Sequence, residues 1–305
     1  MSYEKIKKFD FMKHRKTFFT ISIVITVLGI ISLLVFNLNY GVDFKSGTTL
    51  DITTGKAFDK QQAESLLKEA GVTASVLTMG GNNERVTARF DRVLKDTETQ
   101  AVIAKFKEKF GDQVTYEEST VDVEMARELA RNAIYAVLLA CGLIFAYIII
   151  RFEWRFALGG IIALIHDAFI VISFFSIFHL EVNLPFIAAV LTIIGYSIND
   201  TIVIYDRVRE NLRFAKLKSY RDIAEVVNKS VRQTMTRSIN TVITVLVAAI
   251  CLFAFGSPAI RLFSLAMIVG LVSGAYSSIF IASPIWASLK LGSLEARKRA
   301  VSAKS

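Results

Sequence analysis

The sequence predicts a polytopic α-helical membrane protein with six transmembrane helices and one exterior α+β domain between the first two. Apolar residues make up 53% of the 305 residues, and the mean hydropathy is +0.48, values typical of an integral membrane protein. Apolar runs long enough to cross a bilayer recur along the chain. One long polar segment, residues 37–132, separates the first run from the others.

The first apolar run, residues 17–36, follows a polar and basic N-terminal segment, residues 1–16. As a helix it would be about 30 Å long, enough to span a bilayer. A cleaved signal peptide is the alternative interpretation. The run is too long for the apolar part of a signal peptide, and no small-residue cleavage motif follows it, so we expect an uncleaved transmembrane helix.

The polar segment 37–132 alternates between strand and helix patterns in the order βαββαβ, which is typical of a ferredoxin-like domain. Gly71 and Gly111 follow the two predicted helices, where glycine commonly ends a helix. The predicted elements are a strand at 41–53 with a glycine-rich interruption, a helix at 59–70, strands at 74–79 and 85–90 joined by a hairpin loop, a helix at 96–110, a strand at 114–120 and a helix at 124–132 that leads back to the membrane.

The rest of the chain, residues 133–289, is predicted to lie largely in the membrane. Five further spans are expected, at 133–150, 156–177, 184–204, 239–255 and 262–289. The last is longer than a bilayer requires, and we expect it to bend at Pro284.

The distribution of charge predicts the orientation. The chain carries 36 Lys and Arg against 27 Asp and Glu, a formal charge of +9, which could suggest a nucleic-acid partner. The basic residues instead gather in segments that alternate with the spans, as in a membrane protein whose cytoplasmic segments are basic. We therefore expect the N-terminal segment 1–16, the loop with Arg151 and Arg155, the loop 205–238 and the tail 290–305 to be cytoplasmic, and no nucleic acid to be bound.

Residues 205–236 are rich in charges of both signs, and their spacing predicts one or two amphipathic helices on the inner membrane surface. The segment could be a solvated, lipid-facing connector or a docking surface for a partner. The sequence leaves both interpretations open.

Asp200 is the leading candidate for a functional residue, because it lies inside an apolar helix next to Asn199. A carboxylate at such depth costs about 2.5–3.5 kcal/mol on insertion scales, and such residues commonly line ion or substrate paths. A basic partner could come from Arg237, at the inner end of the fifth span, which would make the two a proton relay. The alternatives are a buried structural hydrogen bond for Asp200 and a guanidinium extended to the membrane interface for Arg237.

His166 and Asp167 form a second polar pair at apolar depth, in the third span. They are weaker candidates, since a His–Asp pair could relay protons or could anchor helix packing through hydrogen bonds. No second His or Cys stands at metal-ligand spacing, so we expect no metal site.

Other patterns indicate structure more than chemistry. Gly270, Gly274 and Ser278 are spaced four apart in the last span, which predicts a close helix-packing face. Cys141 and Cys251 lie in apolar runs and imply no disulfide framework. No phosphate-binding loop, nucleophile elbow, zinc motif or dinucleotide fingerprint occurs, so we expect no cofactor and no enzymatic activity, and any energy would come from an ion gradient.

Four segments together resemble the SecD/SecF family of bacterial protein-export membrane proteins, in the resistance–nodulation–division superfamily, and in particular its smaller, SecF-type members. The segments are GVDFKSGTTL at 41–50, ALIHD at 163–167, GYSINDTIVIYDRVREN at 195–211 and QTMTRSINT at 233–241. The similarity covers almost the whole chain. One departure is visible, because the family often has paired glycines where this chain has Ser46 and Gly47.

The resemblance implies half of a transporter of that superfamily, located in the bacterial cytoplasmic membrane. It implies a SecD-type partner, association with the SecYEG channel and the SecA motor, and exported unfolded preproteins as the substrate. It further implies use of the proton gradient, with Asp200 and Arg237 matching the family's intramembrane aspartate and arginine.

Two other functions remain open at this point, a half of a small-molecule or lipid exporter and a purely structural subunit of the translocon. Exporters of this superfamily usually have much larger exterior domains than the segment 37–132 could form, which disfavours the exporter. Because Asp200 would face lipid in an isolated six-helix unit, we also expect an obligate hetero-oligomer.

Overall fold

Six long helical runs dominate the computed structural model, which describes residues 9–215, 217 and 219–302. Each run is long and apolar enough to cross a membrane. They are α2 (Arg15–Phe36), α6 (Val123–Arg151), α7 (Trp154–Ile177), α8 (Leu184–Leu212), α9 (Tyr220–Phe255) and a final run made of α10 (Pro258–Ser277), the π-helix η1 (Ser278–Ala282) and α11 (Ser283–Ser302). The predictions made for residues 1–8, 216, 218 and 303–305 lie outside the described residues.

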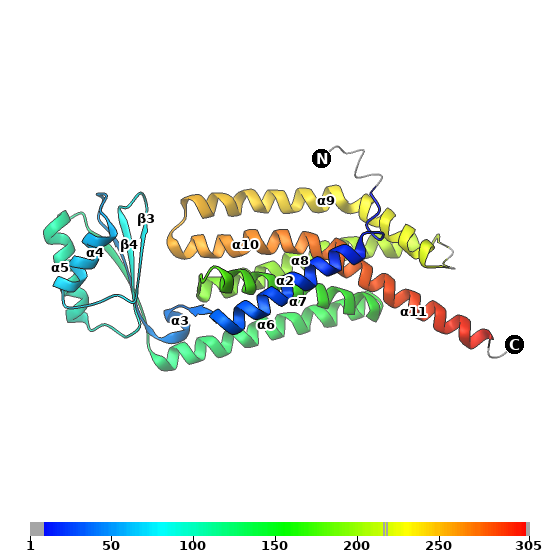
Figure 1. The fold of residues 1–305 in the computed structure, drawn as a ribbon, viewed down its shortest axis with the longest axis horizontal. Coiled ribbons are helices and arrows are strands. Elements are labelled where there is room, and N and C mark those ends of the chain that lie inside the picture. Colours follow the sequence, from blue (N-terminus) through cyan, green and yellow to red (C-terminus); the bar gives the residue numbers. More distant parts are fainter. Residues whose placement is uncertain (1–8, 216, 218, 303–305) are drawn as a thin grey trace.

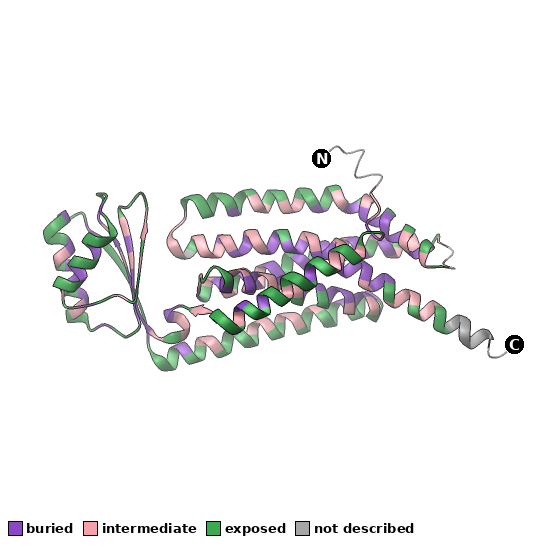
Figure 2. Cartoon of the chain, viewed as in Figure 1, coloured by how far each residue is buried: buried purple, intermediate pink, exposed green. Residues whose placement is uncertain are grey.

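The helices run along the long axis of the molecule, with an α+β domain at one end and both ends of the described chain toward the other (Figure 1). α7, α8 and the final run form the interior of the bundle, whereas α2, α6 and α9 expose most of their surface. Figure 2 shows this contrast as largely exposed outer helices around a more buried centre. The outer helices therefore present apolar side chains outward, as lipid-facing helices do.

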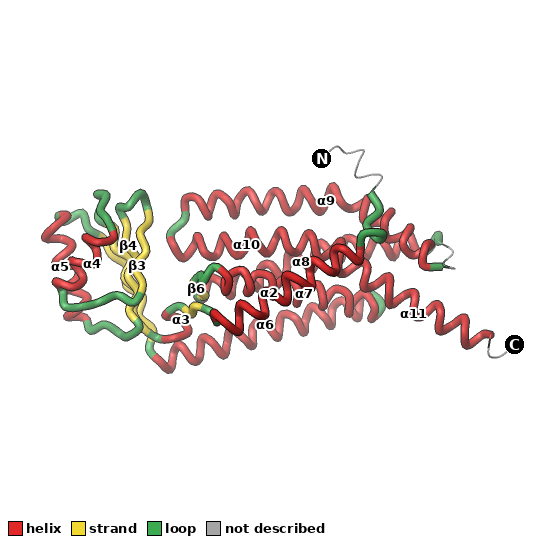
Figure 3. Tube along the Cα trace, viewed as in Figure 1, coloured by secondary structure: helices red, strands yellow, loops and turns green. Residues whose placement is uncertain are grey.

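The α+β domain, residues 47–121, confirms the predicted ferredoxin-like fold. Its antiparallel sheet has the strand order β3-β4-β2-β5, and α4 and α5 cover the face that points away from the bundle (Figure 3). Buried Leu50, Ile52 and Phe106 belong to its core. The elements are β2 (Gly47–Thr53), α4 (Lys60–Glu69), β3 (Val76–Gly80), β4 (Arg85–Phe90), α5 (Asp96–Phe110) and β5 (Thr115–Val121).

The segment that links α2 to the domain differs in its first part from the predicted strand over 41–53 with a glycine-rich interruption. β1 (Asn39–Tyr40) and the short helix α3 (Val42–Lys45) precede β2, which begins only at Gly47. The backbone turns at Ser46, with φ +69°, and at Gly47, with φ +138°, so the two positions interrupt any continuous strand. β1 pairs in parallel with β6 (Glu181–Val182), which lies in the loop between α7 and α8.

The predicted loop 205–238 is mostly helical. α8 continues to Leu212, and α9 begins at Tyr220 and runs without interruption into the fifth span. Ile223, Val227 and Val231 of α9 are buried in the core of the bundle. The apolar face of the first half of α9 thus packs within the chain itself, as expected of an amphipathic helix, while Arg221, Glu225 and Lys229 on its other face are exposed.

The last span bends, as expected, close to Pro284. The bend is built as the π-helix η1, which ends immediately before α11 and its proline. Proline has no N–H to donate and its ring crowds the carbonyl of the preceding turn, so a regular α-helical ladder cannot pass through this point.

Candidate functional site

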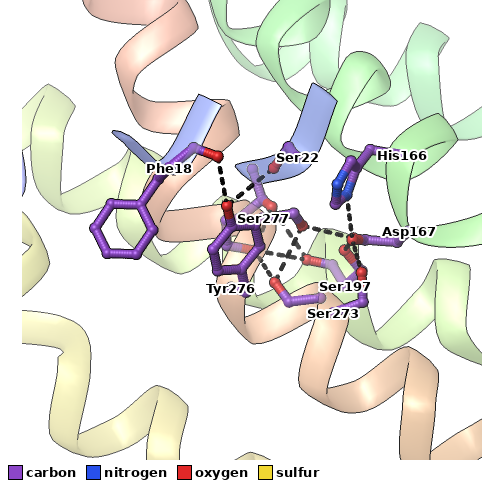
Figure 4. Close-up of polar contacts among 11 residues, drawn as sticks. Phe18, Ser22, His166, Asp167, Ser197, Ser273, Tyr276 and Ser277 are labelled. Atoms are coloured by element: carbon purple, nitrogen blue, oxygen red, sulfur yellow. Dashed lines mark hydrogen bonds and ion pairs between the residues drawn. The ribbon is translucent and has the colours of Figure 1, made fainter. Parts of the chain in front are cut away.

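Asp167 occupies the centre of a polar cluster inside the bundle. Its side chain is 1% exposed, and its carboxylate accepts three hydroxyl hydrogen bonds (Figure 4). Ser197 of α8 and Ser277 of α10 each donate to Oδ2 at 2.6 Å, and Ser273 of α10 donates to Oδ1 at 2.7 Å. One carboxylate on α7 thus joins three interior helices, which satisfies a charge that the apolar surroundings alone could not hold.

His166 extends this cluster toward α2. Its Nδ1 lies 3.2 Å from Oδ1 of Asp167, so the hydrogen bond requires the proton on Nδ1. The ring also lies 6.2 Å, centroid to centroid, from Tyr276, whose hydroxyl donates to the Phe18 carbonyl at 2.8 Å. Ser22 of α2 lies 2.9 Å from the same hydroxyl. Polar groups thus lead from α2 to the buried carboxylate, while His166 Nε2 has no partner in the described part of the chain.

Asp200 lies on α8 one turn beyond Ser197, and both residues line the side of the helix that α9 and α10 cover. Asp200 is 6% exposed and lines a small cleft between α8, α9 and α10 together with Thr241 and Gly274. The expectation that Asp200 would face lipid in the single chain is therefore wrong. The Ser238 hydroxyl of α9 faces the carboxylate without reaching hydrogen-bond geometry, and Ser238 Oγ has no other partner among the described residues. A buried carboxylate with few partners is able to take up and release a proton.

Arg237 acts on Asp200 through space, because no ion pair within 4.0 Å joins the two in the described structure. The arginine is exposed on α9 and lines a pocket with Arg151, Asp206 and Glu210, away from the α+β domain. The guanidinium is thus near enough to influence Asp200 but lies in a separate, more polar pocket.

Asn199, which is next to Asp200 and is a weaker candidate for a functional residue, is exposed on α8. Gly195 and Tyr196 are exposed on the same stretch of the helix, and the described chain leaves this side of α8 uncovered. The five predicted residues are therefore not brought together in one cluster. His166 and Asp167 are on the α7 side, Asp200 and Arg237 are on the α9 side, and Asn199 is directed outward.

The structure adds residues that the sequence did not single out. Ser273 and Ser277 complete the Asp167 cluster, and their signal was a pair of hydroxyls four apart in an apolar helix. Further along α8, the Thr201 hydroxyl lies 2.8 Å from the Ser278 hydroxyl, and the Tyr205 hydroxyl donates to the Ala282 carbonyl at 3.1 Å.

Gly270 and Gly274 bring α10 close to α8, which confirms the predicted packing face. A Cβ at Gly270 would overlap the Ile193 side chain, and one at Gly274 would lie 3.0 Å from Ser197 Cβ. Small residues allow this approach, and the hydroxyls above then reach across the interface.

Two family models match the chain. "Protein export membrane protein SecD/SecF, C-terminal" matches residues 101–292, and "SecD/SecF GG Motif" matches residues 31–57. The second includes the linking segment with β1 and α3, and the first includes all five predicted site residues.

Similar curated proteins carry matching names. A "Protein translocase subunit SecF" of Alicyclobacillus acidocaldarius is 45% identical over 96% of this chain and 96% of its own length. One of Rickettsia bellii is 38% identical over 91% and 92%. The "Protein translocase subunit SecDF" of Bacillus subtilis is 46% identical over 93% of this chain, which spans only 38% of that longer protein.

Two solved structures are also similar. The crystal structure of "SecDF, a translocon-associated membrane protein," from Thermus thermophilus matches with a TM-score of 0.81 at 33% identity, covering 92% of this chain and 38% of that one. A second, "SecDF in Super-membrane-facing form", matches with a TM-score of 0.67 at 30% identity, covering 97% and 40%.

Proposed function

Since this chain belongs to the SecF family of protein-export membrane proteins, and is similar to subunits named as protein translocases, we propose that it pairs with a SecD-type half and uses the proton gradient to promote export of unfolded preproteins. The observation that carries the proposal is Asp200, a buried carboxylate in the middle of α8 with Ser238 and Arg237 beside it.

The SecD-type partner is supported by two observations. This chain is similar to one part, 38% in length, of the SecDF protein of Bacillus subtilis, so a relative carries a further part on the same polypeptide. In addition, the exposed side of α8 carries Tyr196 and Asn199, and a polar group inside a bilayer is costly when it faces lipid. A second half that covers this side would remove the cost.

The proposed orientation places the α+β domain outside the cell and both termini in the cytoplasm of a bacterium. The basic residues near Arg237 and in the tail lie at the end of the bundle away from the domain, in keeping with a basic cytoplasmic side. With this orientation the domain is on the side where an exported chain emerges from the SecYEG channel, to which SecA delivers it.

The proposed chemistry is a reversible protonation of Asp200. When charged, the carboxylate is attracted by Arg237, and when protonated it is not, so the distance between α8 and α9 depends on the proton. A proton that moves down the gradient through this position supplies about 2.3 kcal/mol per 100 mV, enough to shift a two-state equilibrium by roughly fifty-fold.

The test is Asp200→Asn in the reconstituted complex with its SecD-type partner, the channel and the motor. We expect the variant to assemble normally but to lose the acceleration of export by an imposed proton gradient. The matched control is Asp206→Asn on the same helix, where the carboxylate is 54% exposed and pairs with Arg209 at the surface. Undiminished gradient-driven export by Asp200→Asn would reject the proposal and favour a purely structural subunit.

A further inference from the structure

The junction between the α+β domain and the bundle includes the direct connection of β5 to α6 and a set of polar contacts with the loop that leads into α8. β1 pairs with β6 just before α8 begins, and the Gly41 amide donates to the Val182 carbonyl at 2.8 Å. Gly41 leaves room here for the Glu181 side chain, because a Cβ would lie 2.5 Å from Oε1 of Glu181. The linking segment is thus held against the loop that leads into α8.

Arg89 connects the sheet itself to this loop. It lies on β4, its side chain is 8% exposed, and its Nη1 pairs with Oε2 of Glu181 at 3.3 Å. The same guanidinium reaches Oδ1 of Asn39 and the Tyr40 carbonyl at 3.4 Å. Within the described residues, this ion pair is the one polar contact between the four-stranded sheet and the loop between α7 and α8.

Asp43 provides the second connection. Its Oδ2 accepts a 2.7 Å hydrogen bond from the backbone N–H of Leu184, the first residue of α8. The first N–H groups of a helix lack intrahelical partners, and the helix dipole favours a carboxylate there. Asp43 therefore binds the linking segment directly to the end of the helix that carries Asp200.

α8 is an uninterrupted helix from Leu184 to Leu212, with Asp200 roughly 24 Å from its first residue. A rigid helix transmits a shift or tilt along its whole length. Any movement of α8 near Asp200 would therefore displace Leu184, and with it the residues bonded to that end.

We propose that Asp43, Arg89 and Glu181 are positioning residues that couple α8 to the α+β domain, so that proton exchange at Asp200 changes the position of the domain. This inference depends on the proposed proton-driven function. It assigns a mechanical role to a segment, Gly41 to Gly47, whose glycines would otherwise be read as turn residues alone.

The charges around Glu181 are consistent with a contact that forms and breaks. Burial raises the pKa of its carboxyl, Arg89 on β4 lowers that pKa, and Asp43 on α3 and Asp51 on β2 raise it. Desolvation and the carboxylates of Asp43 and Asp51 thus oppose the ion pair between Glu181 and Arg89, so this ion pair is able to break.

The experiment measures the distance between spin labels at Asp112→Cys in the domain and Phe255→Cys at the nearby end of α9. It is done in the full chain complexed with its SecD-type partner, after Cys141 and Cys251 are replaced by serine. We expect an imposed proton gradient to shift the distance distribution of the parent protein. Arg89→Gln and Glu181→Gln should each reduce that shift and gradient-driven export by about 5-fold or more, as lost coupling between sites does.

Arg85→Gln is the matched control, because Arg85 lies on the same strand and, among the described residues, forms ion pairs with Asp51 and Glu117 inside the domain. Asp43→Ala should act like Arg89→Gln, whereas Asp43→Asn, which keeps an oxygen to accept from Leu184, should restore much of the response. A merely structural loss would lower thermal stability in all these variants alike.

The inference is overturned if Arg89→Gln and Glu181→Gln keep the full shift, or if the parent distance does not respond to the gradient. Failure of the proposed function gives a different result, namely gradient-driven export that survives Asp200→Asn. Loss of export in Asp200→Asn together with a normal response in Arg89→Gln would reject the coupling alone.

Discussion

The Ser197 hydroxyl on α8 donates a 2.6 Å hydrogen bond to the buried carboxylate of Asp167 on α7, one turn before Asp200 on the same helix. The helix that carries the proposed proton site is thus fixed in register by a second carboxylate. Two buried aspartates have different surroundings. Asp167 is saturated with hydroxyl donors, whereas the Asp200 carboxylate forms no complete hydrogen bond among the described residues.

Asp167→Ala should destabilise the protein strongly. It would leave the Ser197 and Ser273 hydroxyls buried without their acceptor, while Ser277 keeps the Gly274 carbonyl, a loss of about 2–4 kcal/mol. Asp167→Asn should cost less, since its amide oxygen still accepts. Unfolding in detergent measures both, and Asp206→Ala, at a surface ion pair, should change the free energy of unfolding by less than about 1 kcal/mol. Equal losses for Asp167→Ala and Asp206→Ala would contradict the role of the cluster.

Gly270→Ala should separate α8 from α10. The new Cβ would overlap the Ile193 side chain, with an expected cost of about 1–3 kcal/mol. A second substitution, Ile193→Ala, should recover part of that loss, because the two sites share one contact. Gly195→Ala is the control, since nothing lies within 4 Å of its Cβ position and alanine favours a helix by up to about 1 kcal/mol.

Arg237→Lys should retain most gradient-driven export, whereas Arg237→Gln should reduce it by about tenfold, within the range of coupling between sites. The reason is that Arg237 acts on Asp200 through its charge and not through a two-point contact, so a lysine can replace it. Export rates with and without a gradient provide the measurement. If Arg237→Lys were as inactive as Arg237→Gln, a direct contact between the Arg237 guanidinium and the Asp200 carboxylate would have to form during the cycle.

Stability should depend on pH through Glu181. Because its folded pKa is raised, the ionised carboxylate is less favourable in the folded protein than in the unfolded chain. Relative to Glu181→Gln, the parent protein should therefore lose stability as the pH rises through the raised pKa of Glu181. Thermal unfolding of the parent protein and of Glu181→Gln across this pH range tests the direction of the change. The same pH dependence of stability in both proteins would contradict the prediction.

The pKa of Glu181 should also respond to its neighbours. Arg89→Gln should raise it and Asp43→Asn should lower it, since the guanidinium favours the charged form and the second carboxylate opposes it. The carbonyl band of the protonated carboxyl, assigned by its loss in Glu181→Gln, reports this titration in infrared spectra.

Most of the fold could be predicted because its signals are local. α5 and β4 have the predicted limits, since Gly111 stops the helix and polar turns flank the strand. The six spans follow from apolar length alone. The strand prediction over 41–53 was wrong in its first part, because helix α3 and the turn at Ser46 depend on contacts with the loop before α8.

The arrangement of the site could be predicted only in part. Asp200 and Asp167 were visible as carboxylates in apolar helices. Their different surroundings were not, because the donors to Asp167 come from Ser273 and Ser277, far along the chain. The pairing of Arg89 with Glu181 could not be predicted for the same reason, since no local sequence pattern relates a strand of the domain to a loop between membrane helices.

The contacts between α8 and the last helical run repeat every fourth residue on both sides, with a constant offset of 77 residues at Thr201–Ser278 and Tyr205–Ala282. In a straight α-helix such a repeat drifts around the axis by about 40° per step. The wider turn of η1 offsets part of that drift, so Ser278 and Ala282 both stay on the side of the last run that faces α8. A movement of α8 along the last helical run would therefore have to break both of these contacts together.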